Sequence, residues 1–179
     1  MIRPIPILMY HQIDAPPPRG TPLRGLVVSP FGFSWQMAML RTLGYQGLSM
    51  RDLEPYLEGR KQGRVVGITF DDGYLNNFEH ALPILRKYGH TATCYAVSSL
   101  IGKTNVWDEG VVAVKPLMGV DHWLRWLEAG MDVGSHTCTH ADLQVTDDEL
   151  ALAEMTHSKR ELESMLGTEV RHFCYPYGR

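Results

Sequence analysis

"VVGITFDDGYLNNFEHALPILRKYGHTATCYAV", residues 65–97, decides the fold of this chain. It begins with a β-branched apolar run (65–70), continues with an amphipathic stretch (76–88) and ends in a second apolar run (91–97). Short apolar runs separated by a helical stretch are typical of parallel strands joined by a right-handed crossover helix. We therefore predict a strand–helix–strand unit in this part of the chain.

The same alternation extends over all 179 residues. We predict strands at 5–10, 45–49, 65–70, 91–97, 131–135 and 170–175, and helices at 30–43, 50–58, 76–88, 116–129 and 146–166. Because a glycine-rich dinucleotide loop is missing from the sequence, the pattern favours a (β/α) barrel over a Rossmann sheet. A closed eight-stranded barrel takes about 250 residues. We therefore expect a single domain, 1–179, that forms a barrel without its C-terminal unit or units.

Two helix starts carry recognisable capping signals. Ser29 precedes Pro30, which predicts an N-cap followed by proline at the first helical position. Thr146 and Glu149 have the spacing of a capping box, which predicts a helix starting at this threonine.

Composition excludes several classes of protein. The net charge of -3 and the lack of a Lys/Arg stripe argue against a nucleic-acid partner. Three cysteines give no disulfide framework and fit a reducing compartment. No apolar run approaches the roughly 20 residues that span a bilayer. We expect a cytoplasmic protein if Met1 is the native start, and a secreted or periplasmic one otherwise.

Asp71 and Asp72 follow directly after the predicted strand 65–70. Catalytic residues of α/β barrels lie at such C-terminal strand ends. Neighbouring side chains on an extended chain point in opposite directions, so we expect different roles for the two carboxylates, one as a metal ligand and the other as a base. An ordinary Asp-Asp-Gly surface turn is the alternative that this motif leaves open on its own.

His136 and His140, in "SHTCTH", follow the predicted strand 131–135. On a helical turn, residues four apart share one face, and two imidazoles so placed form half of a zinc site. Together with one aspartate they would form a ligand set with open positions for water. Cys138 would point to another face, and we expect it not to be a ligand.

"RHFCYPYG" (171–178) follows the last predicted strand. Pro176 biases Tyr175 towards an extended conformation, which can hold the Tyr175 backbone N–H in the fixed direction that an oxyanion hole requires. Arg171 could orient a carboxylate such as Asp71. A strand that ends in a turn with a solvated arginine is the alternative.

The motifs "TFDDGY", "SHTCTH" and "RHFCYPYG", in this order, resemble the first three motifs of the NodB-type polysaccharide deacetylases (carbohydrate esterase family four). The resemblance runs from about residue 5 to the end of the chain. It implies a distorted (β/α) barrel, seven-stranded in the full protein. It also implies metal-dependent hydrolysis of N- or O-acetyl groups on sugars.

This resemblance implies that Asp72, His136 and His140 bind the metal. The ion would most often be Zn2+, with Co2+, Ni2+, Fe2+ or Mn2+ as alternatives. A divalent cation lowers the pKa of a bound water and polarises an acyl oxygen.

The resemblance also implies the remaining roles. Asp71 would be the general base that takes a proton from the metal-bound water. The backbone N–H of Tyr175 would stabilise the oxyanion, and Arg171 would orient Asp71. The family's fourth motif is not identifiable, since Trp107 and Asp108 lack its spacing.

The general acid of most family members is a histidine near the C-terminus, and no such motif occurs here. A permuted branch, which includes poly-N-acetylglucosamine deacetylases, begins instead with an apolar strand that ends in Tyr-His. "LMYHQI" matches this pattern, so His11 is the expected acid. It should face the metal pocket across from Asp71, and Asp14 is a candidate partner for it.

We therefore expect a deacetylase that acts on an acetylated carbohydrate, whether polymer, oligomer, or nucleotide- or lipid-linked sugar. One alternative is a hydrolase of C–N bonds in a small molecule, of the cyclic-imide or purine-breakdown type. The other is a catalytically inactive carbohydrate-binding domain. The sequence does not identify the sugar or the oligomeric state.

Overall fold

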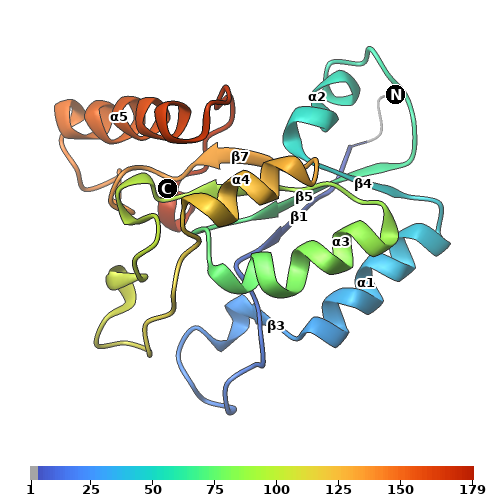
Figure 1. Ribbon diagram of the computed structural model, residues 1–179, viewed down its shortest axis with the longest axis horizontal. Coiled ribbons are helices and arrows are strands. Elements are labelled where there is room, and N and C mark those ends of the chain that lie inside the picture. The colour runs from blue at the N-terminus through green and yellow to red at the C-terminus, as the bar shows by residue number, and fades with distance from the viewer. Residues whose placement is uncertain (1–3) are drawn as a thin grey trace.

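The computed structural model describes residues 4–179 as one parallel sheet with helices packed around it (Figure 1). Its strands are β1 (Ile7–Tyr10), β4 (Gln46–Leu48), β5 (Val65–Phe70), β6 (Thr93–Ala96) and β7 (Asp132–Ser135). Its α-helices are α1 (Pro30–Thr42), α2 (Met50–Leu57), α3 (Leu82–Tyr88), α4 (Val120–Glu128) and α5 (Asp148–Leu166). No helix within the described range is long and apolar enough to cross a membrane.

Strand β5 is the centre of the sheet. β1 pairs along one of its edges, from Ile7 opposite Gly67 to Tyr10 opposite Phe70. β4 and β6 share the other edge: β4 pairs with the N-terminal half of β5 and β6 with its C-terminal half. β7 then extends the sheet from β6. Every residue of β5 is buried, which explains why it reads as an uninterrupted apolar run.

The core lies between this sheet and its helices. Phe70 of β5 stacks on Tyr10 of β1 with ring centroids 5.5 Å apart, and it meets Trp126 of α4 edge to face at 6.1 Å. Phe33 of α1 packs against both Tyr10 and Phe70. This aromatic cluster fixes the C-terminal ends of β1 and β5 beside each other.

Five of the six predicted strands are present, all of them parallel. Residues 170–175 form only an isolated bridge, between Phe173 and Ser135. In the described residues the sheet is open rather than closed into a barrel, and β1 lies beside β5. A further small sheet, β2 (Gln12–Ile13) with β3 (Val27–Val28), has no predicted counterpart.

Of the two helix starts predicted from capping signals, one is confirmed and the other is wrong. The Ser29 side chain caps α1 as predicted, by accepting a hydrogen bond from Gly32 N–H. The predicted capping box at Thr146 is wrong: Asp147 is the N-cap of α5 and accepts from Leu150 N–H. The Thr146 hydroxyl donates instead to the Asp142 carbonyl, a local bond that competes with capping.

Candidate metal site and its surroundings

A hollow of about 340 Å³ lies where the C-terminal ends of β1, β5 and β7 meet. We call it the first hollow. It collects the motifs that the sequence singled out, since its lining includes His11, Asp71, Asp72, His136, His140 and Tyr175. The parallel sheet explains this convergence, because parallel strands present all their C-terminal ends on one edge.

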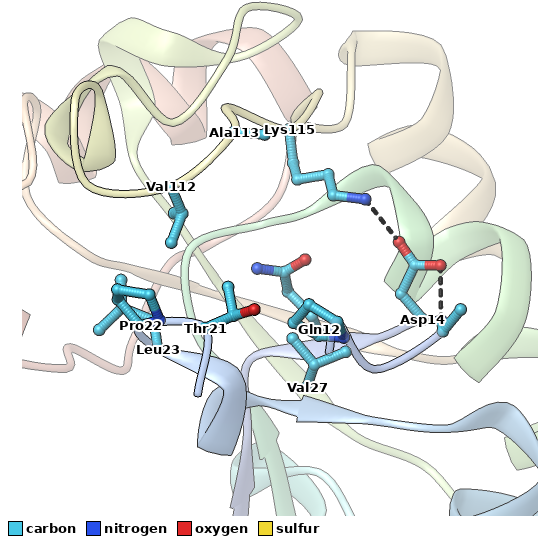
Figure 2. A pocket seen from close by; sticks show the side chains of 11 residues that line it. Gln12, Asp14, Thr21, Pro22, Leu23, Val27, Val112, Ala113 and Lys115 are labelled. Carbon is cyan, nitrogen blue, oxygen red and sulfur yellow. Dashed lines mark hydrogen bonds and ion pairs between the residues drawn. The ribbon is translucent and has the colours of Figure 1, made fainter. Parts of the chain in front are cut away.

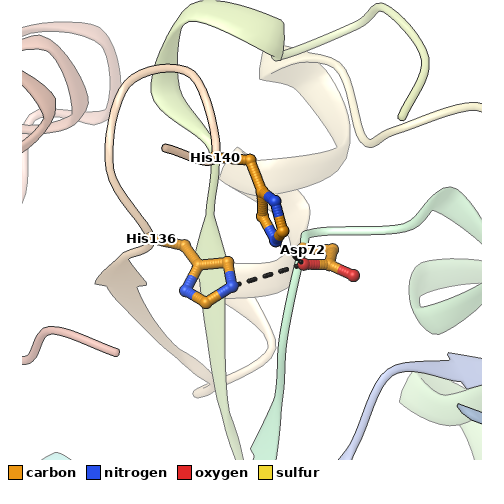
Figure 3. Close-up of side chains that lie close together, drawn as sticks. All are labelled: Asp72, His136 and His140. Carbon is orange, nitrogen blue, oxygen red and sulfur yellow. Dashed lines mark ion pairs between the residues drawn. The ribbon is translucent and has the colours of Figure 1, made fainter. Parts of the chain in front are cut away.

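Asp72, His136 and His140, which we call the Asp–His–His cluster, all line this hollow, and Figure 3 shows their side chains close together. Asp72 Oδ1 is 3.3 Å from His136 Nε2 and 3.2 Å from His140 Nε2. All three side chains are buried, and one ligand atom from each lies within 4.8 Å of the others. Two imidazole nitrogens and one carboxylate oxygen converging on one point are a donor set suited to a divalent ion such as zinc.

Hydrogen bonding prepares His136 for this role. Its Nδ1 lies 2.9 Å from the Cys174 carbonyl oxygen. A carbonyl only accepts, so Nδ1 carries a proton, and Nε2 is the atom that faces the cluster and can hold either a proton or a metal ion. Asp72 Oδ1 is buried and has no conventional hydrogen-bond partner among the described residues, although both imidazole Nε2 atoms lie within 3.3 Å of it. A cation would give all three atoms a partner, so the residues fit a metal ion.

Electrostatics within the cluster are strong. Burial alone would raise the pKa of Asp72, but the two neighbouring imidazoles hold it below its ordinary value. Burial likewise opposes protonation of His136, yet Asp72 and Cys174 raise its pKa to about 10. The Asp72 charge attracts positive charge at this point, whether a proton or a metal ion.

Unusual backbone geometry holds the ligands in place. Asp72, Thr137 and His140 all have φ between 64° and 72°, in the left-handed region that side chains seldom adopt. The segment from His136 to His140 is therefore a strained loop, and the predicted helical turn is wrong. Gly73 also has a positive φ, and a Cβ there would come within 2.8 Å of the Trp123 ring.

Asp71 and His11 face each other at the edge of the cluster, as expected. His11 Nε2 lies 3.9 Å from Asp71 Oδ2, and both line the first hollow. Burial raises the pKa of Asp71, whose Oδ1 makes no hydrogen bond within the described residues. Only Asp72 joins the two histidines, so the two aspartates do point differently. Asp14 is not the partner of His11, since its carboxylate pairs with Lys115 at 3.1 Å.

The third motif is only partly where the resemblance would put it. Tyr175 lines the first hollow, and no backbone acceptor among the described residues engages its N–H. Arg171 needs correction: its guanidinium lies 3.1 Å from Glu54 of α2 rather than on Asp71. The Arg171 side chain lies at the surface and is not part of the lining of the first hollow.

Sequence reasoning missed the residue that supports the loop between the two histidines. Glu154 of α5 is buried, and its carboxylate accepts from the backbone N–H of Cys138 at 2.7 Å and of Thr139 at 3.0 Å. It also accepts from the Thr139 hydroxyl at 2.8 Å. Cys138 faces this helix rather than the cluster, in agreement with its predicted exclusion as a ligand. The signal in the sequence is one of spacing: Glu154 lies eight residues before Leu162 and twelve before Leu166, on the face of α5 that is buried.

Two aromatic side chains that the motifs did not assign form a wall of the site. The Trp107 ring stacks on His140 with centroids 4.2 Å apart and an interplanar angle of 14°. Tyr177 meets the same imidazole edge to face at 4.8 Å. Both also line the first hollow. A partly exposed aromatic wall beside polar side chains suits the apolar face of a sugar ring.

A second hollow, of about 140 Å³, adjoins the first, and Leu23 lines both (Figure 2). It lies between the proline-rich loop after β2 and the loop before α4. The Asp14–Lys115 ion pair joins these loops, and the Val112 side chain points into the space between them.

Comparison with known proteins agrees with the site. The model of one family, described as polysaccharide deacetylase, matches residues 58–179. The Bacillus subtilis protein YxkH is 31% identical over 98% of this chain and 57% of its own length. The Staphylococcus epidermidis poly-β-1,6-N-acetyl-D-glucosamine N-deacetylase is 26% identical over 82% of this chain and 52% of its own. This chain thus spans little more than half the length of these curated relatives.

A solved structure extends the similarity to three dimensions. The Streptococcus pyogenes deacetylase PplD, in complex with acetate, has a TM-score of 0.83 and 29% identity to this chain. The match covers 98% of this chain and 74% of PplD. The fold of this chain thus matches that of a deacetylase over the region that the two share.

Proposed function

This chain belongs to the polysaccharide deacetylase family, and we propose that it removes acetyl groups, above all N-acetyl groups, from a carbohydrate by metal-dependent hydrolysis. The single observation that carries the proposal is the convergence of Asp72, His136 and His140 beside Asp71 and His11. An inactive carbohydrate-binding domain would have no use for a buried, strained ligand set of this kind.

We propose that the Asp–His–His cluster holds one divalent ion, with Zn2+ as the first candidate. Ligand sets that are rich in nitrogen and leave coordination positions open are typical of catalytic zinc sites. When bound, the ion would activate water and polarise the acetyl carbonyl. Co2+, Ni2+, Fe2+ and Mn2+ accept the same ligands.

The neighbouring residues supply the proton transfers. Asp71 would take a proton from the attacking water as its oxygen bonds to the acetyl carbon. The Tyr175 backbone N–H would donate to the carbonyl oxygen as negative charge develops there. His11 would give a proton to the sugar nitrogen as the C–N bond breaks, so that acetate and a free amine leave the site.

The surroundings favour a sugar over a small cyclic imide as substrate. Trp107 and Tyr177 offer aromatic surface beside the cluster, and the second hollow shares Leu23 of its lining with the first. Together they provide room for more than one ring. The named activity of the Staphylococcus epidermidis relative supports N-acetylated oligomers of glucosamine as the first substrates to try.

An acetate-release screen tests the proposal. The purified protein, stripped of metal and reloaded with Zn2+ or Co2+, would be incubated with N-acetylglucosamine oligomers, O-acetyl xylan, and nucleotide- or lipid-linked N-acetyl sugars. We expect metal-dependent acetate release from the N-acetylated oligomers, and none from the His136→Ala variant. Failure of every loaded form on every substrate, or one bound metal per chain in His136→Ala, would refute the proposal.

A further inference from the structure

One helical turn grips the chain segment that carries His11. Asn77 Nδ2 donates a hydrogen bond to the His11 carbonyl at 2.8 Å. Asn76 Oδ1 accepts from Ile13 N–H at 3.3 Å, and His80 Nδ1 lies 2.7 Å from the Ile13 carbonyl. Carbonyls only accept, so Nδ1 of His80 donates. Three side chains from a single turn thus bind the backbone of His11 and of Ile13.

This turn is a π-helix, Asn77–Ala81, inserted before α3. Such single wide turns cost stability relative to α-helix and are frequent at functional sites. Asn77 is fully buried and Asn76 is 7% exposed. The turn follows Asp71 on the same short stretch of chain, so whatever fixes the turn also fixes the position of Asp71.

The other side of His11 is tied to Asp71 directly. The Asp71 backbone N–H donates to the carbonyl of Tyr10 at 2.9 Å, which continues the β1–β5 ladder by one step. His11 therefore lies between two anchors. Its preceding peptide is bonded to Asp71 and its own carbonyl is bonded to Asn77. These two bonds hold the backbone on either side of the His11 side chain, whose Nε2 lies 3.9 Å from Asp71 Oδ2.

Packing alone does not account for an asparagine at this position. Asn77 Oδ1 is buried with no hydrogen-bond partner among the described residues. Burying an amide oxygen in this way is unfavourable, and a leucine of similar size would fill the space without that cost. The Nδ2 bond to His11 is the contact that an apolar residue could not make.

We propose that Asn77, supported by Asn76 and His80, is a positioning residue that holds His11 at the distance from Asp71 that proton delivery to the leaving group requires. The inference rests on the proposed function, in which His11 is the general acid. Asn77 touches neither substrate nor cluster in this role and acts only through His11.

The test separates the acid step from the rest of the reaction by the choice of leaving group. An amine leaves a sugar only with a proton, whereas the nitrophenolate of 4-nitrophenyl acetate leaves without one. In metal-loaded Asn77→Leu, we expect kcat on an N-acetylglucosamine oligomer to fall about 10- to 100-fold with KM little changed. Turnover of 4-nitrophenyl acetate and bound metal per chain should stay at wild-type levels.

A double-mutant cycle and two further variants sharpen the result. In a His11→Ala background, Asn77→Leu should cause no additional loss on the oligomer, because its effect passes through that imidazole. His80→Leu should also lower kcat on the oligomer and spare 4-nitrophenyl acetate. Because His80 is partly exposed, this variant keeps the test possible if Asn77→Leu folds poorly. His90→Leu is the matched control: His90 Nε2 donates to the Met37 carbonyl at 3.1 Å, another buried side-chain bond to backbone, and its loss should spare the ratio of the two activities.

The outcomes are distinct. A wild-type protein that releases no acetate from any sugar would overturn the proposed function and this inference with it. A wild-type protein that does so, with an Asn77→Leu variant that is normal on the oligomer or equally impaired on both substrates, would overturn the inference alone. Additive losses in the double mutant would also overturn it.

Discussion

The Glu154 carboxylate accepts a hydrogen bond from the Cys138 backbone N–H at 2.7 Å, midway between the two histidines of the cluster. Together with its two bonds to Thr139, this contact holds a loop in which Thr137 and His140 have left-handed backbone conformations. A carboxylate from α5 thus sets the spacing of two side chains that it does not touch.

Replacing Glu154 with glutamine should therefore weaken metal binding although every ligand remains. A neutral amide oxygen accepts the two backbone bonds more weakly than a charged carboxylate does, and the glutamine NH2 group would force the Thr139 hydroxyl to accept rather than donate. We expect zinc affinity to fall about 10- to 100-fold, as is usual when support for metal ligands is lost. Competition with a chromophoric chelator measures the affinity. Glu149→Gln, exposed at the start of the same helix, is the control, and equal affinities for the two variants would contradict the prediction.

His11 is expected to act after metal binding, not in it. Since its nearest charged partner is Asp71 rather than the cluster, His11→Ala should keep its metal. We expect kcat for acetate release from an N-acetylated oligomer to fall by about 10²–10⁴. Steady-state kinetics and elemental analysis of the same sample check both parts. Near-normal turnover would remove this histidine from the reaction.

Arg171 is expected to be dispensable for catalysis. Its side chain is 49% exposed and pairs with Glu54, so its loss should cost about 0–1 kcal/mol of unfolding free energy. Arg171→Met should therefore retain wild-type kcat and metal content, as measured by acetate release and elemental analysis. A large fall in kcat without loss of metal would restore the role in orienting Asp71 that the family resemblance implies.

Comparison of the structure with the sequence shows where sequence reasoning succeeds. "TFDDG" and "SHTCTH" each follow a strongly apolar strand, and a parallel sheet brings such strand ends together whatever else the chain does. The gathering of Asp71, Asp72, His136 and His140 at one site could therefore be predicted from local patterns. His11 required a resemblance in addition, because a strand end with one histidine carries little information by itself.

The rest depended on contacts between distant parts of the chain. Glu54, which forms an ion pair with Arg171, lies more than a hundred residues before it in the sequence. No glycine marks the left-handed turns at Thr137 and His140, because tertiary contacts impose them. The pairing of β1 with β5, which places His11 beside Asp71, skips β4 and cannot be read from the order of the strands.

At the opposite end of β7 from the cluster, His172 and Asp132 should give the unfolding free energy a defined pH dependence. Asp132, whose carboxylate lies 3.4 Å from His172 Nδ1, raises the pKa of His172 above 6.5, and Glu54 adds to the effect. The stability this gives is present below about pH 6.5 and is lost as pH rises through the folded value. Burial opposes ionisation of Asp132, but His172 and Thr93 lower its pKa below 3.8. Its contribution is present above that pH and is lost as pH falls through the folded value.

The pair should accordingly contribute most between about pH 4 and pH 6.5. The difference in unfolding free energy between wild type and His172→Gln, measured by urea denaturation, should be largest there and shrink towards pH 8. A His172→Gln difference that stays constant from pH 5 to pH 8 would rule out this coupling.

The second hollow should matter only for substrates longer than one sugar. The Val112 side chain points into it, so Val112→Trp would fill the space that a neighbouring ring would occupy (Figure 2). We expect KM for an N-acetylglucosamine tetramer to rise about tenfold, a loss of about 1.4 kcal/mol of binding. Turnover of 4-nitrophenyl acetate, which reaches only the first hollow, should not change. Val111→Trp, next in the chain but outside the lining, is the control, and a tetramer KM that rises equally in both variants would mean that the loop, rather than the hollow, is responsible.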